Sequence, residues 1–206
     1  MTFERVNSFK YLGTLITTQH TSAEINNTIT LANRSYFGMM NMLKAKNINS
    51  KHKVTMYKTL IKSVLMYGAE TWVLRKVDEL RLGVFERKIL RRIYGPICEE
   101  AVQRSRYDEE LYRLYDEADL VTTIKITRLQ WAGHVMQMQD NLPCKKITLD
   151  KREGRRRAGR PNLRWIDGVT KDAEKLGVRN WRARARARDR DDWRQLLESA
   201  KTLRGL

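Results

Sequence analysis

Two clusters of carboxylates are the residues of this sequence whose type could support metal-dependent phosphoryl transfer. Asp108, Glu109 and Glu110 form one cluster, and Asp191 and Asp192 form the other. Two-metal chemistry needs carboxylates that are held close together on a rigid element, usually at the end of a strand. Neither cluster follows an apolar strand, and neighbouring residues of a helix point about 100° apart. We therefore interpret both clusters as acidic first turns of helices, where carboxylates interact favourably with the helix dipole.

The histidines and cysteines do not have the spacing of a metal site. They are His20, His52, His134, Cys98 and Cys144. None of them pair as C-x-x-C or H-x3-H, the spacings typical of structural zinc sites. The sequence also lacks a nucleophile elbow, a Walker lysine loop and a dinucleotide-binding glycine motif. We expect no metal, no cofactor and no self-contained active site.

The chemistry that the sequence does support is the binding of phosphates by basic side chains. Residues 151–164 hold seven basic side chains, one acid and two glycines. Arginine forks bind phosphate oxygens in pairs, and glycines let a backbone approach a phosphate chain closely. A solvated loop or a nuclear-localisation signal would have the same composition. A second basic surface is predicted on a helix over residues 77–94, and a third basic segment covers residues 182–190. The phosphate-binding residues predicted from these segments are Arg87, Lys88, Arg91, Arg92, Arg155, Arg156, Arg157, Arg160, Arg164, Arg182, Arg184 and Arg186.

The overall charge favours a polyanionic partner. The chain has 206 residues, with 41 Lys and Arg against 24 Asp and Glu, a net charge of +17. Residues 1–100 carry +8, residues 101–150 carry −1 and residues 151–206 carry +10. Nucleic acid is the first candidate for the partner, and a membrane surface the second. No apolar run is long enough to span a membrane and no secretory signal is visible, so we expect an intracellular protein in the nucleus or the cytoplasm.

The positions of apolar residues predict a mostly α-helical fold. Residues 3–16 should be extended and form a short N-terminal β-hairpin with its turn at Asn7-Ser8. Helices are predicted over residues 22–43, 50–68, 77–94, 108–117, 120–138, 162–176 and 180–203, the last with a break near Asp189. Residues 145–161 should form an exposed, Arg-rich loop. Tryptophans at 131, 165, 181 and 193 could stack on bases, but their positions on apolar helix faces favour a core role. We expect one domain over residues 1–97 and a second over residues 98–206.

Five segments, in this order, resemble the reverse transcriptases of non-LTR retrotransposons. Residues 9–13 read Phe-Lys-Tyr-Leu-Gly, like the primer-grip hairpin of that family, and residues 67–72 are similar to its YG-x-E-x-W element. Residues 128–134 resemble its RL-x-W-x-GH segment, and residues 159–167 its GRP-x-x-RW-x-D segment. Trp181 with residues 189–194 resembles the closing W…DR…W. Together the segments span nearly the whole chain.

The resemblance implies the part of a reverse transcriptase that follows the polymerase palm: primer grip, helical thumb and basic C-terminal extension. It places Lys10, Tyr11 and Gly13 near a primer terminus. The family's catalytic [FY]-x-D-D motif does not occur in this sequence, so we expect no polymerase activity from this chain alone. The expected function is binding of RNA, an RNA–DNA hybrid or DNA through its backbone, with the palm and fingers of the parent polymerase as a further partner. The alternative is a helical interaction protein that docks on an acidic protein.

Overall fold

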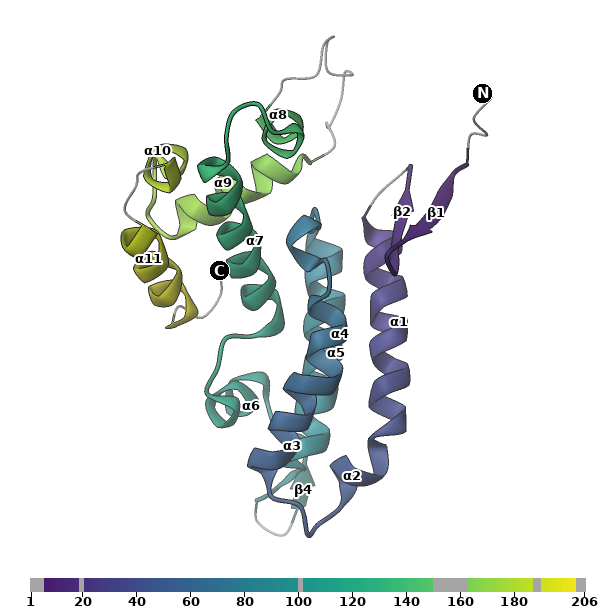
Figure 1. The fold of residues 1–206 in the computed structure, drawn as a ribbon. Helices are drawn as coiled ribbons and strands as arrows, with labels where there is room; N and C mark the ends of the chain where they lie inside the picture. The colour runs from purple at the N-terminus through teal and green to yellow at the C-terminus, as the bar shows by residue number, and fades with distance from the viewer. Residues whose placement is uncertain (1–5, 19–20, 100–101, 150–162, 187–189, 203–206) are drawn as a thin grey trace. The chain divides into compact units, whose positions relative to one another are not determined.

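The computed structural model describes residues 6–18, 21–99, 102–149, 163–186 and 190–202 (Figure 1). The chain divides into two compact units, which we call the N-terminal unit (Met1–Val121) and the C-terminal unit (Thr122–Leu206). The expected fold class is confirmed, because the described chain is mostly α-helical and begins with a short β-hairpin. Most of the predicted Arg-rich loop lies outside the described residues.

The N-terminal unit combines helices with two short hairpins. Its elements in chain order are β1 (Ser8–Tyr11), β2 (Thr14–Thr17), α1 (Ser22–Gly38), α2 (Met40–Lys44), α3 (Ser50–Met56), the π-helical turn η1 (Tyr57–Lys62), α4 (Ser63–Met66), the 3-10 turn η2 (Ala69–Thr71), α5 (Lys76–Tyr94), β3 (Ile97–Glu99), β4 (Val102–Arg104) and α6 (Asp108–Tyr115). The elements after it are α7 (Leu120–Gln137), α8 (Pro143–Leu149), α9 (Trp165–Lys175), α10 (Trp181–Arg186) and α11 (Arg190–Thr202). The unit boundary lies downstream of the boundary at residue 97 expected from the sequence, because α6 packs against α5.

The N-terminal hairpin forms, but its turn is not where the sequence analysis placed it. Tyr11 pairs with Thr14, so Leu12 and Gly13 make a two-residue turn. Both have positive φ angles, 47° and 86°, as a type I′ turn requires. Asn7 instead precedes the first strand, and Ser8 is its first residue. Glycine adopts such a φ without steric cost, and this explains Gly13 at the tip.

The core of the N-terminal unit follows the predicted apolar stripes of its long helices. On α5, Leu82 and Ile89 are fully buried, as predicted, and the helix ends at Gly95 with a φ of 69°. In the second helical segment, helical spacing predicts that Val64 and Gly68 continue the buried stripe, but the buried residues are Leu65 and Ala69, one position later. The π-helical turn η1 explains this, because its wider turn shifts the phase of the residues that follow.

The sequence analysis missed a hairpin and a helix. Strands β3 and β4 form a second antiparallel hairpin with three paired positions, too short for an alternating pattern to be recognised. Helix α8 covers Lys145 to Leu149, which were predicted to be irregular. Lys145 is buried there and donates from Nζ to the carbonyl oxygens of Met136 (3.0 Å) and Met138 (2.6 Å). Its ammonium thus binds the free carbonyls at the C-terminus of α7, a favourable position for a cation.

The C-terminal unit buries one apolar cluster between α7, α9, α10 and α11. Leu129, Val135 and Val169 are fully buried in it, and Trp181 and Trp193 are nearly so. The core interpretation of these two tryptophans is therefore confirmed. Gly177, with a φ of 76°, lies directly after α9 where the sequence predicted a stop.

Candidate nucleic-acid interface

The hairpin tip packs on the turn after α4, and this contact joins the first two of the resembling segments. Tyr67 donates its hydroxyl hydrogen to the carbonyl oxygen of Leu12 at 2.7 Å. A Cβ on Gly13 would lie 3.8 Å from the Tyr67 ring, and a Cβ on Gly68 would lie 3.5 Å from the hydroxyl of Thr14. The two glycines therefore face the contact, and both have positive φ angles.

One face of the hairpin is apolar and open to solvent. Phe9 pairs with Ile16 across the strands, and cross-strand partners share a face. Phe9 is 49% exposed, Ile16 42% and Tyr11 60%. In β2, the backbone N–H of Leu15 donates to the buried carboxylate of Glu24 in α1 at 2.7 Å. This hydrogen bond ties the hairpin to α1. An exposed apolar patch of this kind is typical of an interaction surface.

The four basic residues predicted on α5 do not form one free face. Arg87 and Arg91, one helical turn apart, both pair with Asp108 at the start of α6, at 3.1 and 2.6 Å. Arg91 also donates to the carbonyl oxygen of Arg106. The single carboxylate offsets one of the two guanidinium charges, so these two arginines offer less free charge to a phosphate than their number suggests. Phosphate binding by the four residues stays a prediction.

Lys88 lies on the other side of α5, facing α1. Its Nζ donates to Asn33 at 3.2 Å and sits 4.9 and 5.0 Å from the ring centroids of Tyr36 and Phe37. Arg81, two turns earlier, donates to Asn26 at 3.0 Å. Both bonds join residues 55 positions apart, so α1 and α5 run in parallel along this seam.

A third type of arginine environment occurs at the second hairpin. Arg104 is held between two carboxylates, with its guanidinium 2.5 Å from Glu99 and 2.8 Å from Glu110. The hydrogen bonds from Arg104 lower the pKa of Glu110 to about 2, and they raise the pKa of Arg104 itself. This arginine is neutralised within the unit.

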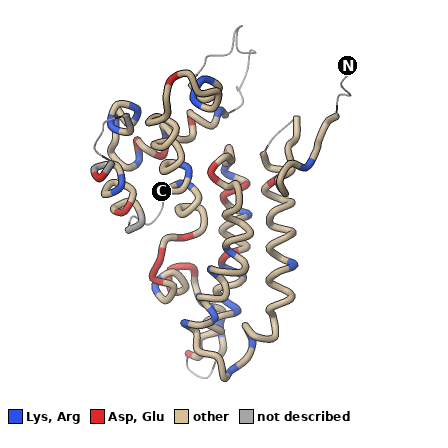
Figure 2. The backbone as a smooth tube through the Cα atoms, viewed as in Figure 1, with Lys and Arg blue, Asp and Glu red and all other residues tan. Residues whose placement is uncertain are grey.

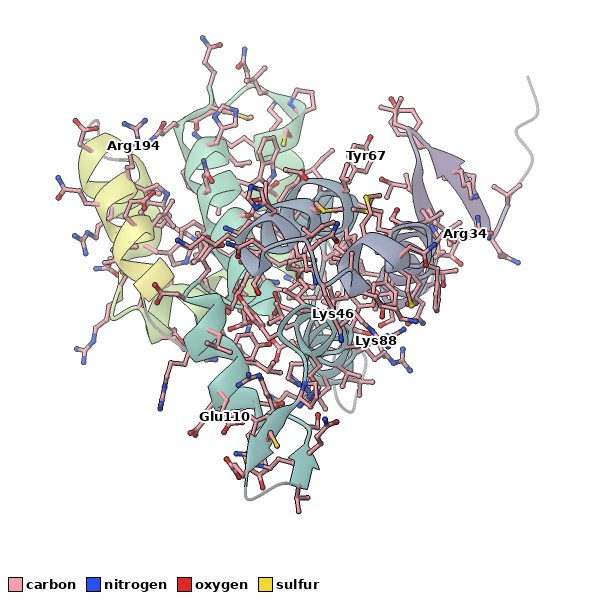
Figure 3. The ribbon with its side chains drawn as sticks, turned by 90° about the horizontal axis from the view of Figure 1, so that it is seen from below. Arg34, Lys46, Tyr67, Lys88, Glu110 and Arg194 are labelled. Atoms are coloured by element: carbon pink, nitrogen blue, oxygen red, sulfur yellow. The ribbon has the colours of Figure 1, made fainter. Side chains whose placement is uncertain are left out.

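A group of exposed cations lies at one end of the N-terminal unit. From Ile25 to Ala69 the chain contains no Asp or Glu and seven Lys or Arg. This stretch forms most of α1, all of α2 and α3, and the loop between them. Figure 2 shows basic positions where α2, α3 and the C-terminal end of α5 meet, and Figure 3 views this end. Its exposed basic side chains are Arg34, Lys44, Lys46, Lys51, Lys88 and Arg92.

The predicted interface residues of the C-terminal unit are only partly described. Arg155, Arg156, Arg157 and Arg160 lie outside the described residues, as does the side chain of Arg186. Arg182 and Arg184 are exposed on α10, and the guanidinium of Arg182 lies 5.7 Å from the Trp181 ring. Arg164 is half-buried just before α9.

Arg128 and Gly133 of the resembling segment 128–134 make close contacts within the C-terminal unit. Arg128 and Asp172 form an ion pair in which both side chains are nearly inaccessible to solvent. A Cβ on Gly168, which directly follows the segment 159–167, would lie 3.1 Å from the Arg128 guanidinium. A Cβ on Gly133 would lie only 2.2 Å from Nε1 of Trp193, which belongs to the segment 189–194. Packing thus accounts for Arg128, Gly133 and Trp193.

A buried carboxylate joins the elements of the N-terminal unit around α5. Glu86 is fully buried and accepts hydrogen bonds from the hydroxyls of Tyr57 (3.0 Å) and Tyr112 (3.1 Å) and from the backbone N–H of Leu120 (2.8 Å). Burial raises the pKa of Glu86, although these bonds and nearby Lys62 act in the opposite direction. The sequence analysis did not single out this residue, since a Glu in an amphipathic helix resembles any surface acid.

The described residues contain no cluster of three or more potential metal ligands. Asp108, Glu110 and Asp191 instead pair with arginines: Asp108 with Arg87 and Arg91, Glu110 with Arg104, and Asp191 with Arg194. Within the same residues, no helix combines the length and the apolar character needed to cross a membrane.

Comparison with known proteins gives one informative likeness. The chain is 24% identical over 160 residues to an uncharacterised transposon-derived protein of Caenorhabditis elegans. The aligned part is 75% of this chain, and the chain spans 57% of the length of that relative. No protein-family model and no solved structure matches the chain. The likeness supports a transposon-related origin.

Proposed function

We propose that this chain is the post-palm part of a non-LTR retrotransposon reverse transcriptase and binds template–primer or target nucleic acid through the sugar–phosphate backbone. The observation that carries the proposal is the acid-free stretch 25–69, in which four of the seven basic side chains, Arg34, Lys44, Lys46 and Lys51, are exposed. A surface of free cations without an element that reads base edges suits sequence-tolerant binding of a backbone. The transposon-derived relative supports the origin of the chain, and an intracellular ribonucleoprotein would be its setting.

The contacts between the resembling segments support the assignment to this family. Segments 9–13 and 67–72 meet at Tyr67, and segments 128–134 and 189–194 meet at Gly133 and Trp193. Each unit thus contains a contact that joins two of the resembling segments.

The open face of the hairpin fits the further proposal that the rest of a polymerase docks there. Phe9, Tyr11 and Ile16 are apolar and exposed on a hairpin whose other side is tied to α1. In this proposal Lys10 and Tyr11 lie close to the primer terminus, and the polymerase carboxylates belong to a segment other than this chain. Primer extension by the purified chain should therefore be undetectable.

Ultraviolet crosslinking with peptide mapping tests the binding function. The purified chain is irradiated with a 20-base-pair RNA–DNA hybrid that carries 4-thiouridine in the RNA strand. We expect nucleotide adducts on peptides from residues 25–52, and further adducts within 151–164 or 182–194. If the hybrid binds but no adduct forms in any of these segments, the assigned surface is wrong.

The second candidate is a helical protein that docks on an acidic protein partner. Exposed Lys and Arg would also bind carboxylates, and such binding is equally sensitive to salt. Crosslinking in cells separates the two functions: adducts to RNA or DNA support the first, and adducts to protein alone support the second.

A further inference from the structure

An exposed aromatic ring stands among the free cations of the N-terminal unit. Phe37, in the last turn of α1, is 58% exposed. A single exposed phenylalanine is ordinary in a folded protein, so its surroundings decide what it can do. They consist of basic side chains from α1, from the loop after α2 and from α5.

The ring of Phe37 is held in place by its neighbours. The adjacent Tyr36 is almost fully buried, and its ring lies 5.3 Å from the Phe37 ring at an angle of 59°. The Nζ of Lys88 lies 5.0 Å from the Phe37 centroid, close enough for a cation–π interaction. Lys88 is itself positioned by its hydrogen bond to Asn33. The platform therefore needs little ordering when a ligand arrives, which favours affinity.

Free cations flank this platform. Arg34, Lys46 and Arg92 are exposed, and among the described residues none of them has an ion-pair partner. Figure 3, which views the unit from below, labels Arg34, Lys46 and Lys88. The seam between α1 and α5 joins residues 55 positions apart, and the same offset places Arg92 level with Phe37. The one acid in the C-terminal half of α5 is Glu86, which is buried.

We propose that this surface, which we call the Phe37 platform, binds single-stranded nucleic acid. One unpaired base stacks on the Phe37 ring, and the neighbouring phosphates contact Arg34, Lys88 and Arg92. A ring among cations is the arrangement that single-strand-binding surfaces use, because every base has a face that can stack. A duplex keeps its bases stacked on one another and cannot offer one to the platform except at an end. The inference rests on the proposed nucleic-acid binding and adds to it a strand state and a stacking residue.

Binding of a fluorescein-labelled 20-nucleotide single strand, measured by anisotropy at fixed salt, tests the Phe37 platform. A 20-base-pair duplex is the parallel probe, and RNA and DNA versions of the strand show which sugar is preferred. Phe37→Ala should weaken single-strand binding at least about fivefold, since a base–aromatic stack contributes about 1–3 kcal/mol. It should change duplex binding less than twofold. Phe37→Trp should restore single-strand affinity, because an indole also stacks.

Tyr107→Ala is the matched control. The Tyr107 ring is 66% exposed and has the Arg104 guanidinium 4.5 Å from its centroid, but that arginine is neutralised by Glu99 and Glu110. This variant should bind the single strand like the parent chain. Arg34→Glu tests the charge of the same platform independently of the ring, because Arg34 is exposed and has no described partner. We expect it to weaken single-strand binding at least fivefold.

The results separate failure of the inference from failure of the proposed function. If the parent chain binds both probes and neither Phe37→Ala nor Arg34→Glu weakens single-strand binding more than Tyr107→Ala does, the Phe37 platform is refuted and the nucleic-acid function stands. If the parent chain binds neither probe but is retained by an acidic protein, both proposals are overturned. Thermal unfolding of each variant shows that the fold is intact.

Discussion

At the scale of single residues, the partner of a basic side chain decides whether that charge is available. Arg87 and Lys88 are neighbours in sequence, yet one pairs with Asp108 and the other faces the aromatic rings of α1. The helical spacing correctly placed both on the polar side of α5. It could not reveal that Asp108, in a helix packed against α5, would neutralise one side of that surface. Candidate residues counted from sequence therefore overestimate the free charge.

Glu86 is an acidic residue that is buried and has a structural role. Its carboxylate accepts from Tyr57, Tyr112 and Leu120, and burial raises its pKa. A raised pKa means that the folded state holds a proton on Glu86 more tightly than the unfolded state does. Glu86 therefore contributes most stability below about pH 4.5, where a glutamate of the unfolded chain is protonated, and this contribution is lost as pH rises through its folded pKa.

We predict that Glu86→Gln removes this dependence on pH. A glutamine amide keeps the size of the side chain and can bond the same neighbours without a charge. The free energy of unfolding of the parent chain should fall relative to that of the variant as pH rises from 4.5 towards neutrality. Urea denaturation of both proteins at several pH values measures the difference. Two curves that stay parallel across this range would show that Glu86 does not titrate differently on folding.

At the scale of elements, periodicity predicted the helices well and their interruptions poorly. Helix α5 was predicted within one residue of its start, because its apolar residues recur at helical spacing and Gly95 ends it. The π-helical turn in η1, the hairpin β3–β4 and helix α8 were missed. Each is a short feature that depends on tertiary contacts, such as the capping of α7 by Lys145, rather than on a repeating pattern.

The turn of the N-terminal hairpin also depends on a contact with a residue that is distant in sequence. Asn7-Ser8 has turn-forming residue types, but the turn that formed has Gly13 at its tip and packs against Tyr67. Gly13 suits this turn because its φ is 86°. Which segment approaches it could not be derived from residue types, because Tyr67 is 54 positions further along the chain.

Gly133→Ala tests whether α7 and α11 can pack closely only because residue 133 has no Cβ atom. In most helices alanine is more stable than glycine by about 1 kcal/mol. Here the new Cβ would lie 2.2 Å from Nε1 of Trp193 and 2.8 Å from its Cδ1, and the indole is rigid and buried. We predict that the variant lowers the free energy of unfolding by about 2 kcal/mol or more, as expected for an overpacked core. Thermal unfolding followed by tryptophan fluorescence measures this.

Gly38→Ala is the control for that variant. Gly38 is the last residue of α1, and a Cβ there would meet nothing within 4 Å. The same substitution should therefore leave stability unchanged or raise it by up to about 1 kcal/mol. Equal effects of the two substitutions would mean that Trp193 does not restrict the backbone at Gly133.

At the scale of the whole chain, a net charge of +17 overstates what a polyanion would meet. Arg104 and Arg128 are held by carboxylates, and Lys145 by carbonyl oxygens and Asp140. A group of exposed cations in the N-terminal unit lies in the acid-free stretch 25–69 and at the C-terminal end of α5. Its location matters more than the total, because each phosphate contact releases counterions from the nucleic acid.

The salt dependence of duplex binding should follow the free cations only. Six phosphate contacts would give a log–log slope of roughly −5 on B-DNA. Replacing Arg34, Lys44 and Lys46 by serine removes three exposed cations that have no ion-pair partner among the described residues. We predict that this triple variant flattens the slope by about 2 to 3, measured by anisotropy of a labelled 20-base-pair duplex between 50 and 200 mM salt.

The control variant makes the same change in net charge at neutralised positions. Arg87, Arg91 and Arg104 are all bound to carboxylates, so their replacement by serine should change the slope by less than about 1. Because these ion pairs are at least partly exposed, each contributes little to stability, and the fold should survive their loss. Net charge alone predicts equal slopes for the two triple variants. Equal slopes would therefore contradict the prediction that only cations without an internal ion pair bind the sugar–phosphate backbone of the duplex.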